Sequence, residues 1–119
     1  MCKKISAIKG VLASIFHSFN VMHYDENVSP LKYATSKFKA SVGQDAKKFR
    51  DLVIGDTEQV ISFAIQDFET IGAGGGVRLK IYTVVFTEGS LFLFEANVSF
   101  ISSNDGDKWQ IDSYEVIDK

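Results

Sequence analysis

Apolar residues recur at helical spacing near the start of the chain. Lys9 and Gly10 interrupt the apolar stretch and no small-residue cleavage site follows it, so the segment does not match a signal peptide. Because residues three and four positions apart share one face of a helix, the pattern predicts a packed amphipathic helix. Its apolar stripe consists of Ile5, Ile8, Leu12, Ile15, Phe19 and Met22.

Two shorter helices are predicted in the rest of the first half of the chain. Ser29 can cap the first of them, Pro30 suits its first turn, and Gly43 ends it. Asp45 can cap the next helix, which Gly55 ends. The residues expected to face inward are Leu31, Ala34, Phe38 and Val42 in the first, and Ala46, Phe49, Leu52 and Val53 in the second.

From residue 57 onward, apolar residues alternate with polar ones, and Val, Ile, Phe, Tyr and Thr become frequent. Both features are typical of β-strands. Turn residues separate the strands at a glycine-rich loop (70–76), at Glu88-Gly89 and at Asn104-Asp105-Gly106-Asp107. The predicted strands lie near 57–69, 77–87, 91–102 and 108–117.

Tight turns fix which residues face one another, because a two-residue loop sets the register of a hairpin. A loop at Glu88-Gly89 aligns the second and third strands, and a loop at Asp105-Gly106 aligns the third and fourth. All four strands then share one apolar face, which supports the alignment. The predicted core-face pairs are Val85 with Phe92, Thr83 with Phe94, Ile81 with Ala96, Leu79 with Val98, Phe100 with Ile111, Ser102 with Trp109, and Ile61, Phe63 and Ile65 with Val85, Thr83 and Ile81.

The opposite face of the predicted sheet is polar at one end, with Arg78, Lys80, Asp112 and Tyr114, and apolar at the other. A contiguous apolar area on the outside of a sheet is typical of a surface that another surface covers. We therefore predict a homodimer; the alternative is that the N-terminal segment covers this area. The predicted interface residues are Tyr82, Val84, Phe86, Leu91, Leu93 and Val116, with Val60 beside them.

A long helix, two short helices and an antiparallel meander make an α+β arrangement with helices on one face of a sheet. This order resembles the cystatin-like, nuclear transport factor 2-like superfamily. The resemblance implies N-terminal helices packed on a curved four-stranded antiparallel sheet that forms a cone. The motifs that carry it are packing motifs, similar to those of an uncharacterised family of small proteins: KYATSKFK (32–39), VG (42–43), FRDLV (49–53) and DKWQID (107–112).

Isomerase-like and dehydratase-like enzymes of that superfamily hold a carboxylate base or a histidine in the cone, opposite a hydrogen-bond donor. By this resemblance, Asp67 is the candidate base, and Tyr33 or Tyr24 is the candidate donor at the pocket mouth. The alternative for Asp67 is a strand-end residue that reaches solvent. The polar residues expected to face the core are Asp67, Thr83, Ser102 and Ser113.

The core-face side chains either line an open cone, which would hold a small apolar ligand, or plug it, which would exclude the enzyme hypothesis. The predicted ligand-pocket residues are Phe63, Thr83, Phe94, Phe100 and Trp109.

The sequence predicts no metal site and no cofactor. His17 and His23 have no acidic cluster beside them. The glycines at 72–76 precede a strand, whereas a nucleotide-binding loop needs a following helix.

Composition narrows the class of protein. The 119 residues are 45% hydrophobic and 24% charged, which fits one folded domain over residues 1–119. A single cysteine, Cys2, excludes a disulfide framework, and no apolar run approaches the ~20 residues that span a membrane. The cytoplasm is therefore the default expectation for location.

Charge is divided unevenly along the chain. Residues 1–50 carry nine Lys/Arg and three Asp/Glu, and residues 51–119 carry four and twelve. No aromatic interleaving or recognisable nucleic-acid motif accompanies the basic residues, so the sequence does not favour nucleic-acid binding. An adaptor or immunity protein that meets an oppositely charged partner is one hypothesis from this division, and it requires salt-sensitive association.

The leading hypothesis is a non-enzymatic binding module for a small apolar ligand or a protein partner, self-associating through the outer sheet face. The alternative is a cofactor-free isomerase-like or dehydratase-like enzyme with a carboxylate base in the cone.

Overall fold

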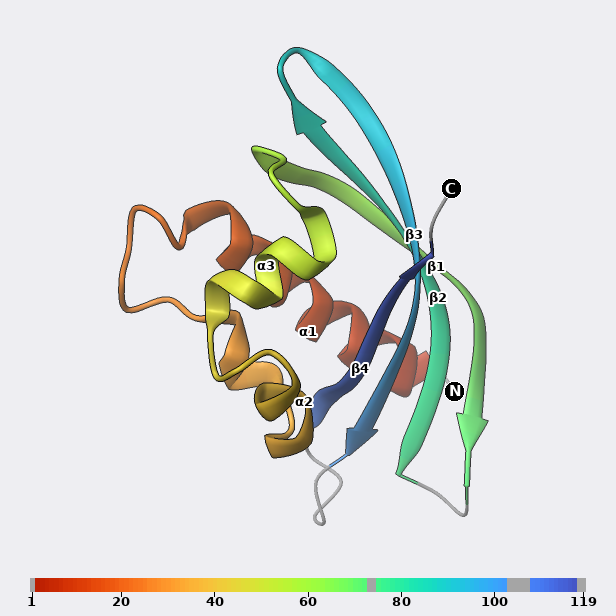
Figure 1. The fold of residues 1–119 in the computed structure, drawn as a ribbon. Helices are drawn as coiled ribbons and strands as arrows, with labels where there is room; N and C mark the ends of the chain where they lie inside the picture. The colour runs from red at the N-terminus through yellow and green to blue at the C-terminus, as the bar shows by residue number, and fades with distance from the viewer. Residues whose placement is uncertain (1, 73–74, 103–107, 118–119) are drawn as a thin grey trace.

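The first half of the chain forms helices and the second half forms a sheet (Figure 1). The computed structural model describes residues 2–72, 75–102 and 108–117. The predicted long helix and four strands are confirmed. The elements are α1 (Cys2–Val21), the 3₁₀ helix η1 (Pro30–Tyr33), α2 (Ser36–Ser41), α3 (Ala46–Ile54), β1 (Gln59–Ile71), β2 (Gly76–Thr87), β3 (Ser90–Ser102) and β4 (Trp109–Ile117).

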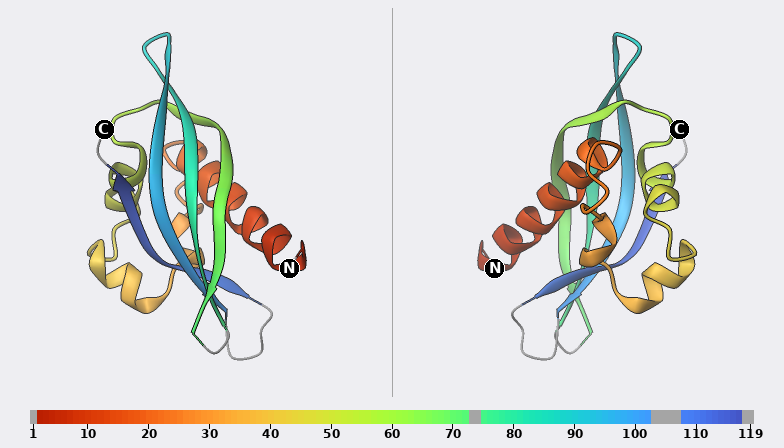
Figure 2. Two further views of the ribbon diagram at one scale, coloured as in Figure 1. Left: turned by 90° about the vertical axis from the view of Figure 1, so that its right-hand side faces the viewer. Right: turned by 90° about the vertical axis from the view of Figure 1, so that its left-hand side faces the viewer.

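The four strands pair antiparallel in the order β1-β2-β3-β4. The long helix α1 runs diagonally across one face of the curved sheet, and the shorter helices lie on the same side (Figure 2). We call this the inner face. No helix of the described residues covers the other face, which we call the outer face (Figure 2). No described helix is long and apolar enough to cross a membrane.

The β2–β3 hairpin has the predicted register. Its turn residues Glu88 and Gly89 both have positive φ angles, 49° and 82°, as a two-residue hairpin loop of type I′ requires. This turn matches the twist of the strands, which is why its sequence predicts the pairing. The confirmed pairs are Val85 with Phe92, Thr83 with Phe94, Ile81 with Ala96 and Leu79 with Val98.

The edge strand β1 contains an extra residue near its start, where the register shifts at Ile61. Val60 therefore pairs with Val85 and is buried, whereas Ile61 is 50% exposed. The predicted pairing of Ile61 with Val85 is wrong, because two adjacent apolar residues give no sign of which one faces inward. Farther along, Phe63 and Ile65 have their predicted partners.

The edge strand β4 also contains an extra residue, Asp112. The shift places Tyr114 in the core and leaves Ser113 exposed, the reverse of the prediction. Val116 pairs with the buried Ala96 and packs against the core. Its predicted place in the outer interface is therefore wrong.

The predicted second helix is broken into η1 and α2. Between them, Ala34 forms a parallel bridge with Ile111, and the Thr35 amide donates to the Ile111 carbonyl (3.0 Å). The Thr35 hydroxyl accepts from the Phe38 amide and donates to Asp112 Oδ1 (2.9 Å). The backbone is extended here because it docks on β4, and helical spacing alone does not reveal this.

Asp45 caps α3 as predicted, by accepting from the Lys47 and Lys48 amides. Phe49 and Val53 are buried, but Leu52 is 43% exposed, so its predicted inward position is wrong.

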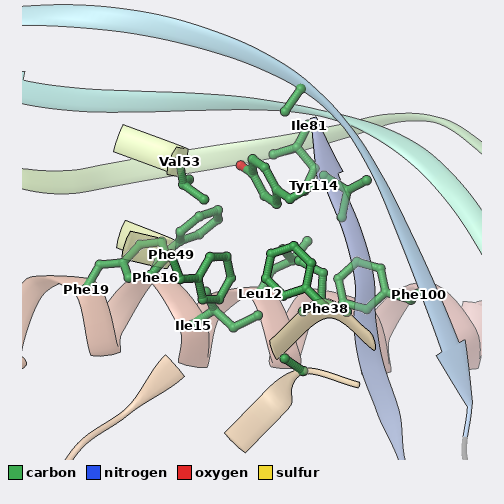
Figure 3. Close-up of a cluster of buried hydrophobic side chains, with 14 of the residues drawn as sticks. Leu12, Ile15, Phe16, Phe19, Phe38, Phe49, Val53, Ile81, Phe100 and Tyr114 are labelled. Carbon is green, nitrogen blue, oxygen red and sulfur yellow. The ribbon is translucent and has the colours of Figure 1, made fainter. Parts of the chain in front are cut away.

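Aromatic side chains fill the space between α1 and the inner face (Figure 3). Phe49 is the centre of the cluster, with ring centroids 5.1 Å from Phe19 and 4.9 Å from Phe38. Both pairs are edge-to-face, the arrangement that aromatic rings favour. The predicted turn at 104–107 and residues 73–74 of the glycine-rich loop lie outside the described residues.

Arg50 of α3 connects its own helix to the end of α1 and to the segment before β1. Its Nε donates to the Phe19 carbonyl (2.9 Å), and its Nη2 donates to the carbonyls of Thr57 and Glu58 (both 3.0 Å). The guanidinium is permanently charged and carries several fixed donors, so it can serve all three carbonyls at once. The end of α1 is thereby fixed against the segment that leads into β1.

We expect Arg50→Ala to lower the free energy of unfolding by about 2–4 kcal/mol, because it removes charge-assisted hydrogen bonds and leaves their acceptors unpaired. Lys47→Ala is the matched control on the same helix. It removes only an exposed ion pair with Asp51 (3.4 Å), which should cost less than about 1 kcal/mol. Urea unfolding measures both values, and equal losses would contradict the role assigned to Arg50.

Candidate functional site

Asp67 lies outside the core. A second extra residue in β1, between Gln66 and Glu69, lets Phe68 pack against the core in its place. The backbone of Asp67 has a φ of 54°, and its side chain is 73% exposed, with Oδ2 3.9 Å from Lys80 Nζ. The prediction that Asp67 faces the core is wrong. A carboxylate in this position is not in an apolar pocket and cannot act as a base there.

The two candidate donors lie elsewhere. Tyr24 follows α1, is 82% exposed, and stacks on His23 with ring centroids 4.0 Å apart. Tyr33 ends η1 and is partly buried against the core. The structure therefore does not bring Asp67, Tyr24 and Tyr33 together as a catalytic set.

The inside of the predicted cone is closed by packed side chains. Phe100 is fully buried and Thr83 is 1% exposed, so the prediction that they line an open pocket is wrong. Phe63 and Phe94 are partly buried against the same core. The ring centroid of Phe63 lies 5.2 Å from that of Phe16. Trp109 packs at the margin of the core, where β4 begins.

A polar pair lies within this core. The Tyr114 hydroxyl forms a side-chain hydrogen bond with Thr83, and burial raises the pKa of Tyr114 to about 12. A satisfied hydrogen bond offsets the cost of burying both hydroxyls. Figure 3 shows Tyr114 among the aromatic side chains of the core, so the pair has a structural role.

A surface pocket of about 530 Å³ brings together two residues that the sequence had assigned separately, Tyr33 and Trp109. We call it the Trp109 pocket. Its other lining residues come from α1, η1, the start of β4 and the residue that precedes β4: Ala7, Val11, Lys32, Gln110 and Lys108. Sequence reasoning missed Ala7 and Val11, although their spacing of four residues beside the core stripe was a usable signal.

Several large apolar side chains are exposed at one end of the sheet. There the β2–β3 hairpin extends beyond the helices (Figure 1). Leu91 is 63% exposed, Leu93 is 47% exposed, and Ile61 of β1 is 50% exposed. They share the outer face with the partly buried Val84 and Phe86, and we call these five residues the hairpin patch. Tyr82, also predicted for the interface, is partly buried at its border.

The middle of the outer face is charged. Lys80 Nζ lies 3.2 Å from Glu95 Oε2, and Arg78 Nε lies 3.2 Å from Glu69 Oε1. The hydrogen bond and charge of Glu95 raise the pKa of Lys80. The hairpin patch is therefore bordered by side chains of both charge signs, which form ion pairs with one another.

Within the described residues, no group of three or more His, Cys, Asp or Glu side chains is placed to hold a metal ion.

Comparison with known proteins supports the fold only. No protein-family model and no curated protein matches the chain. One similar solved structure is an NTF2-like protein of unknown function from Exiguobacterium sp. 255-15, with 13% sequence identity and a TM-score of 0.52. The match covers 92% of this chain and 99% of that chain. The protein thus has the NTF2-like α+β fold that the sequence resemblance implied.

Tyr114 predicts how stability changes at high pH. Its pKa is about 12 in the folded protein and about 10 in an unfolded chain, so the folded state retains the proton longer. The resulting stabilisation is complete below about pH 10 and is lost as the pH rises toward 12. Between about pH 9 and pH 11.5 the loss should approach about 2 kcal/mol.

Urea unfolding of Tyr114→Phe tests this assignment, because that variant cannot titrate at position 114. Its stability should decrease less between the two pH values than that of the wild type. Tyr24→Phe, at an exposed position, should behave as the wild type does. The raised pKa of Lys80 contributes a loss of the same sign to all three proteins and cancels in the comparison. A wild-type slope in Tyr114→Phe would contradict the assignment.

Proposed function

We propose that this protein is a small protein-binding module that assembles as a homodimer through the hairpin patch on the outer face of its sheet. The observation that carries the proposal is the exposure of Ile61, Leu91 and Leu93, each between 47% and 63%, at one end of the sheet on β1 and β3, the two strands that flank β2. Monomeric proteins rarely leave large apolar side chains clustered in this way.

Association would remove this surface from water. Each square ångström of apolar surface that is buried contributes roughly 25 cal/mol, before the entropic cost of association is subtracted. Aromatic and aliphatic residues at the centre of an interface with a polar rim are the usual arrangement. The hairpin patch, bordered by Lys80 and Glu95, matches this arrangement.

A second copy of the chain is the partner that the composition of the patch favours. A two-fold interface requires a surface that complements itself, and a uniformly apolar patch does so. At its border, the ion pairs carry both signs, so two copies related by a two-fold axis can place Lys80 of one near Glu95 of the other. The projecting hairpin also makes Phe92, 49% exposed on the inner side, available to the partner.

The structure does not favour the isomerase-like alternative, because its candidate base Asp67 is exposed on the outer face beside Lys80. The adaptor hypothesis, which uses the uneven charge of the two halves, differs in its salt dependence. Raising the salt from about 0.1 M to about 1 M shortens the screening length from about 10 Å to about 3 Å. Apolar association through the hairpin patch should persist under that change, whereas charge-driven association should not.

We expect the wild type to have twice the chain mass of 13.2 kDa in sedimentation or light-scattering measurements. The double variant Leu91→Asp, Leu93→Asp should have the mass of one chain, because burying two carboxylates in the interface is unfavourable. Both side chains are exposed, so its circular dichroism should match that of the wild type.

Ile101→Asp is the matched control. Ile101 is 38% exposed on the outer face of the same strand, at the end away from the hairpin turn, and its substitution should leave the dimer intact. A monomeric wild type, or an unchanged dimer in the double variant, would contradict the proposal.

A further inference from the structure

The Trp109 pocket has an apolar floor. Val11, Tyr33 and Trp109 are each partly buried against the core and present their remaining surface to the pocket. Ala7, one helical turn before Val11, is exposed at the same place and leaves room because its side chain is small. A volume of about 530 Å³ lies within the range of small-molecule sites, which are lined mainly by apolar and aromatic side chains.

The charged side chains that line the Trp109 pocket are all basic. Two lysines line it, and none of its lining residues in the described chain is acidic. Lys32 Nζ lies over the Tyr33 ring, 5.2 Å from the ring centroid, and no carboxylate of the described residues pairs with it. Lys108 already takes part in another interaction, so Lys32 is the ammonium group that we assign to a ligand contact. An apolar floor with an ammonium group beside it suits an anion that also has an apolar part.

We propose that the Trp109 pocket binds small amphipathic carboxylates. The apolar part of the ligand packs on Val11, Tyr33 and Trp109, and its carboxylate accepts a hydrogen bond from the Lys32 ammonium group. Lys32 can reach the ligand because its present contact, with the face of an aromatic ring, is weak at an exposed site.

This site is separate from the hairpin patch. Trp109 pairs with Ser102 at the C-terminal end of β3, and Leu91 lies at the N-terminal end of the same strand. Eleven residues of extended strand separate the two ends, which corresponds to about 36 Å. Variants at one site therefore leave the other intact, and the inference stands or fails independently of the proposed dimer.

Trp109 is the only tryptophan of the chain, so intrinsic fluorescence reports on this pocket directly. The probe is decanoate, with 1-decanol and decyltrimethylammonium as neutral and cationic probes of the same chain length. We expect decanoate to change the Trp109 emission saturably, with decanol binding more weakly and the cation more weakly still. Isothermal calorimetry provides a second readout of the same affinities.

Lys32→Glu should weaken decanoate binding by at least about 10-fold, because it replaces attraction with repulsion, and should leave decanol affinity unchanged. Lys9→Glu is the matched control: it makes the same charge change on α1 at an exposed residue that does not line the pocket. Its decanoate affinity should stay within about twofold of the wild type, as expected for a screened distant charge. Ala7→Phe, which fills the pocket without a charge change, should weaken both decanoate and decanol.

Several results would overturn the inference. Equal affinity for decanoate and the cationic probe would show that the pocket does not select anions. An unchanged decanoate affinity in Lys32→Glu would remove the proposed contact, and no response in either fluorescence or calorimetry would remove the site. Loss of decanoate binding in Leu91→Asp, Leu93→Asp, with binding retained in Ala7→Phe, would place the ligand on the hairpin patch instead.

Discussion

Three extra residues in the edge strands determine which side chains of the sheet meet α1. Each β-bulge reverses the facing of the residues beyond it and increases the local bend of the strand. The two shifts in β1 place Val60 and Phe68 on the core, and the shift in β4 does the same for Tyr114. Without the shift near Asp67, β1 would direct a carboxylate at the aromatic core, which is strongly unfavourable for an unpaired charge. The closed interior of the fold therefore depends on these bulges.

The bulge in β4 also positions the helical segment that forms the Trp109 pocket. Asp112 is the extra residue, and its Oδ1 accepts from the Thr35 hydroxyl while Oδ2 lies 3.4 Å from Lys37 Nζ. Together with the bridge from Ala34 to Ile111, these contacts hold η1 and α2 against β4. Tyr33 is thereby placed beside Trp109. A feature of the sheet edge thus creates a surface pocket while the cone itself is filled.

The central hairpin could be predicted from sequence because Glu88-Gly89 favours a two-residue turn, and the register set by that turn places the core residues of both strands on one face. The edge strands could not be predicted as well, because a bulge is specified by packing against helices that a strand pattern does not contain. Asp67 followed by Phe68, and Ser113 followed by Tyr114, did carry a signal: in both pairs the predicted register put the polar residue inside. Tyr33 and Trp109 of the Trp109 pocket were both named from the sequence, but in separate roles. Their proximity could not be predicted, because it results from the docking of η1 on β4.

In the proposed dimer, a second copy of the chain covers the hairpin patch. Hydrogen–deuterium exchange of the wild type at low and high protein concentration tests it most directly, because the hairpin projects beyond the helices and is free to fray in a monomer. We expect amides of residues 84–93 to exchange more slowly at high protein concentration, whereas amides of residues 97–101 should exchange at the same rate at both concentrations. Exchange of residues 84–93 that does not depend on concentration, in a protein with the mass of one chain, would contradict it.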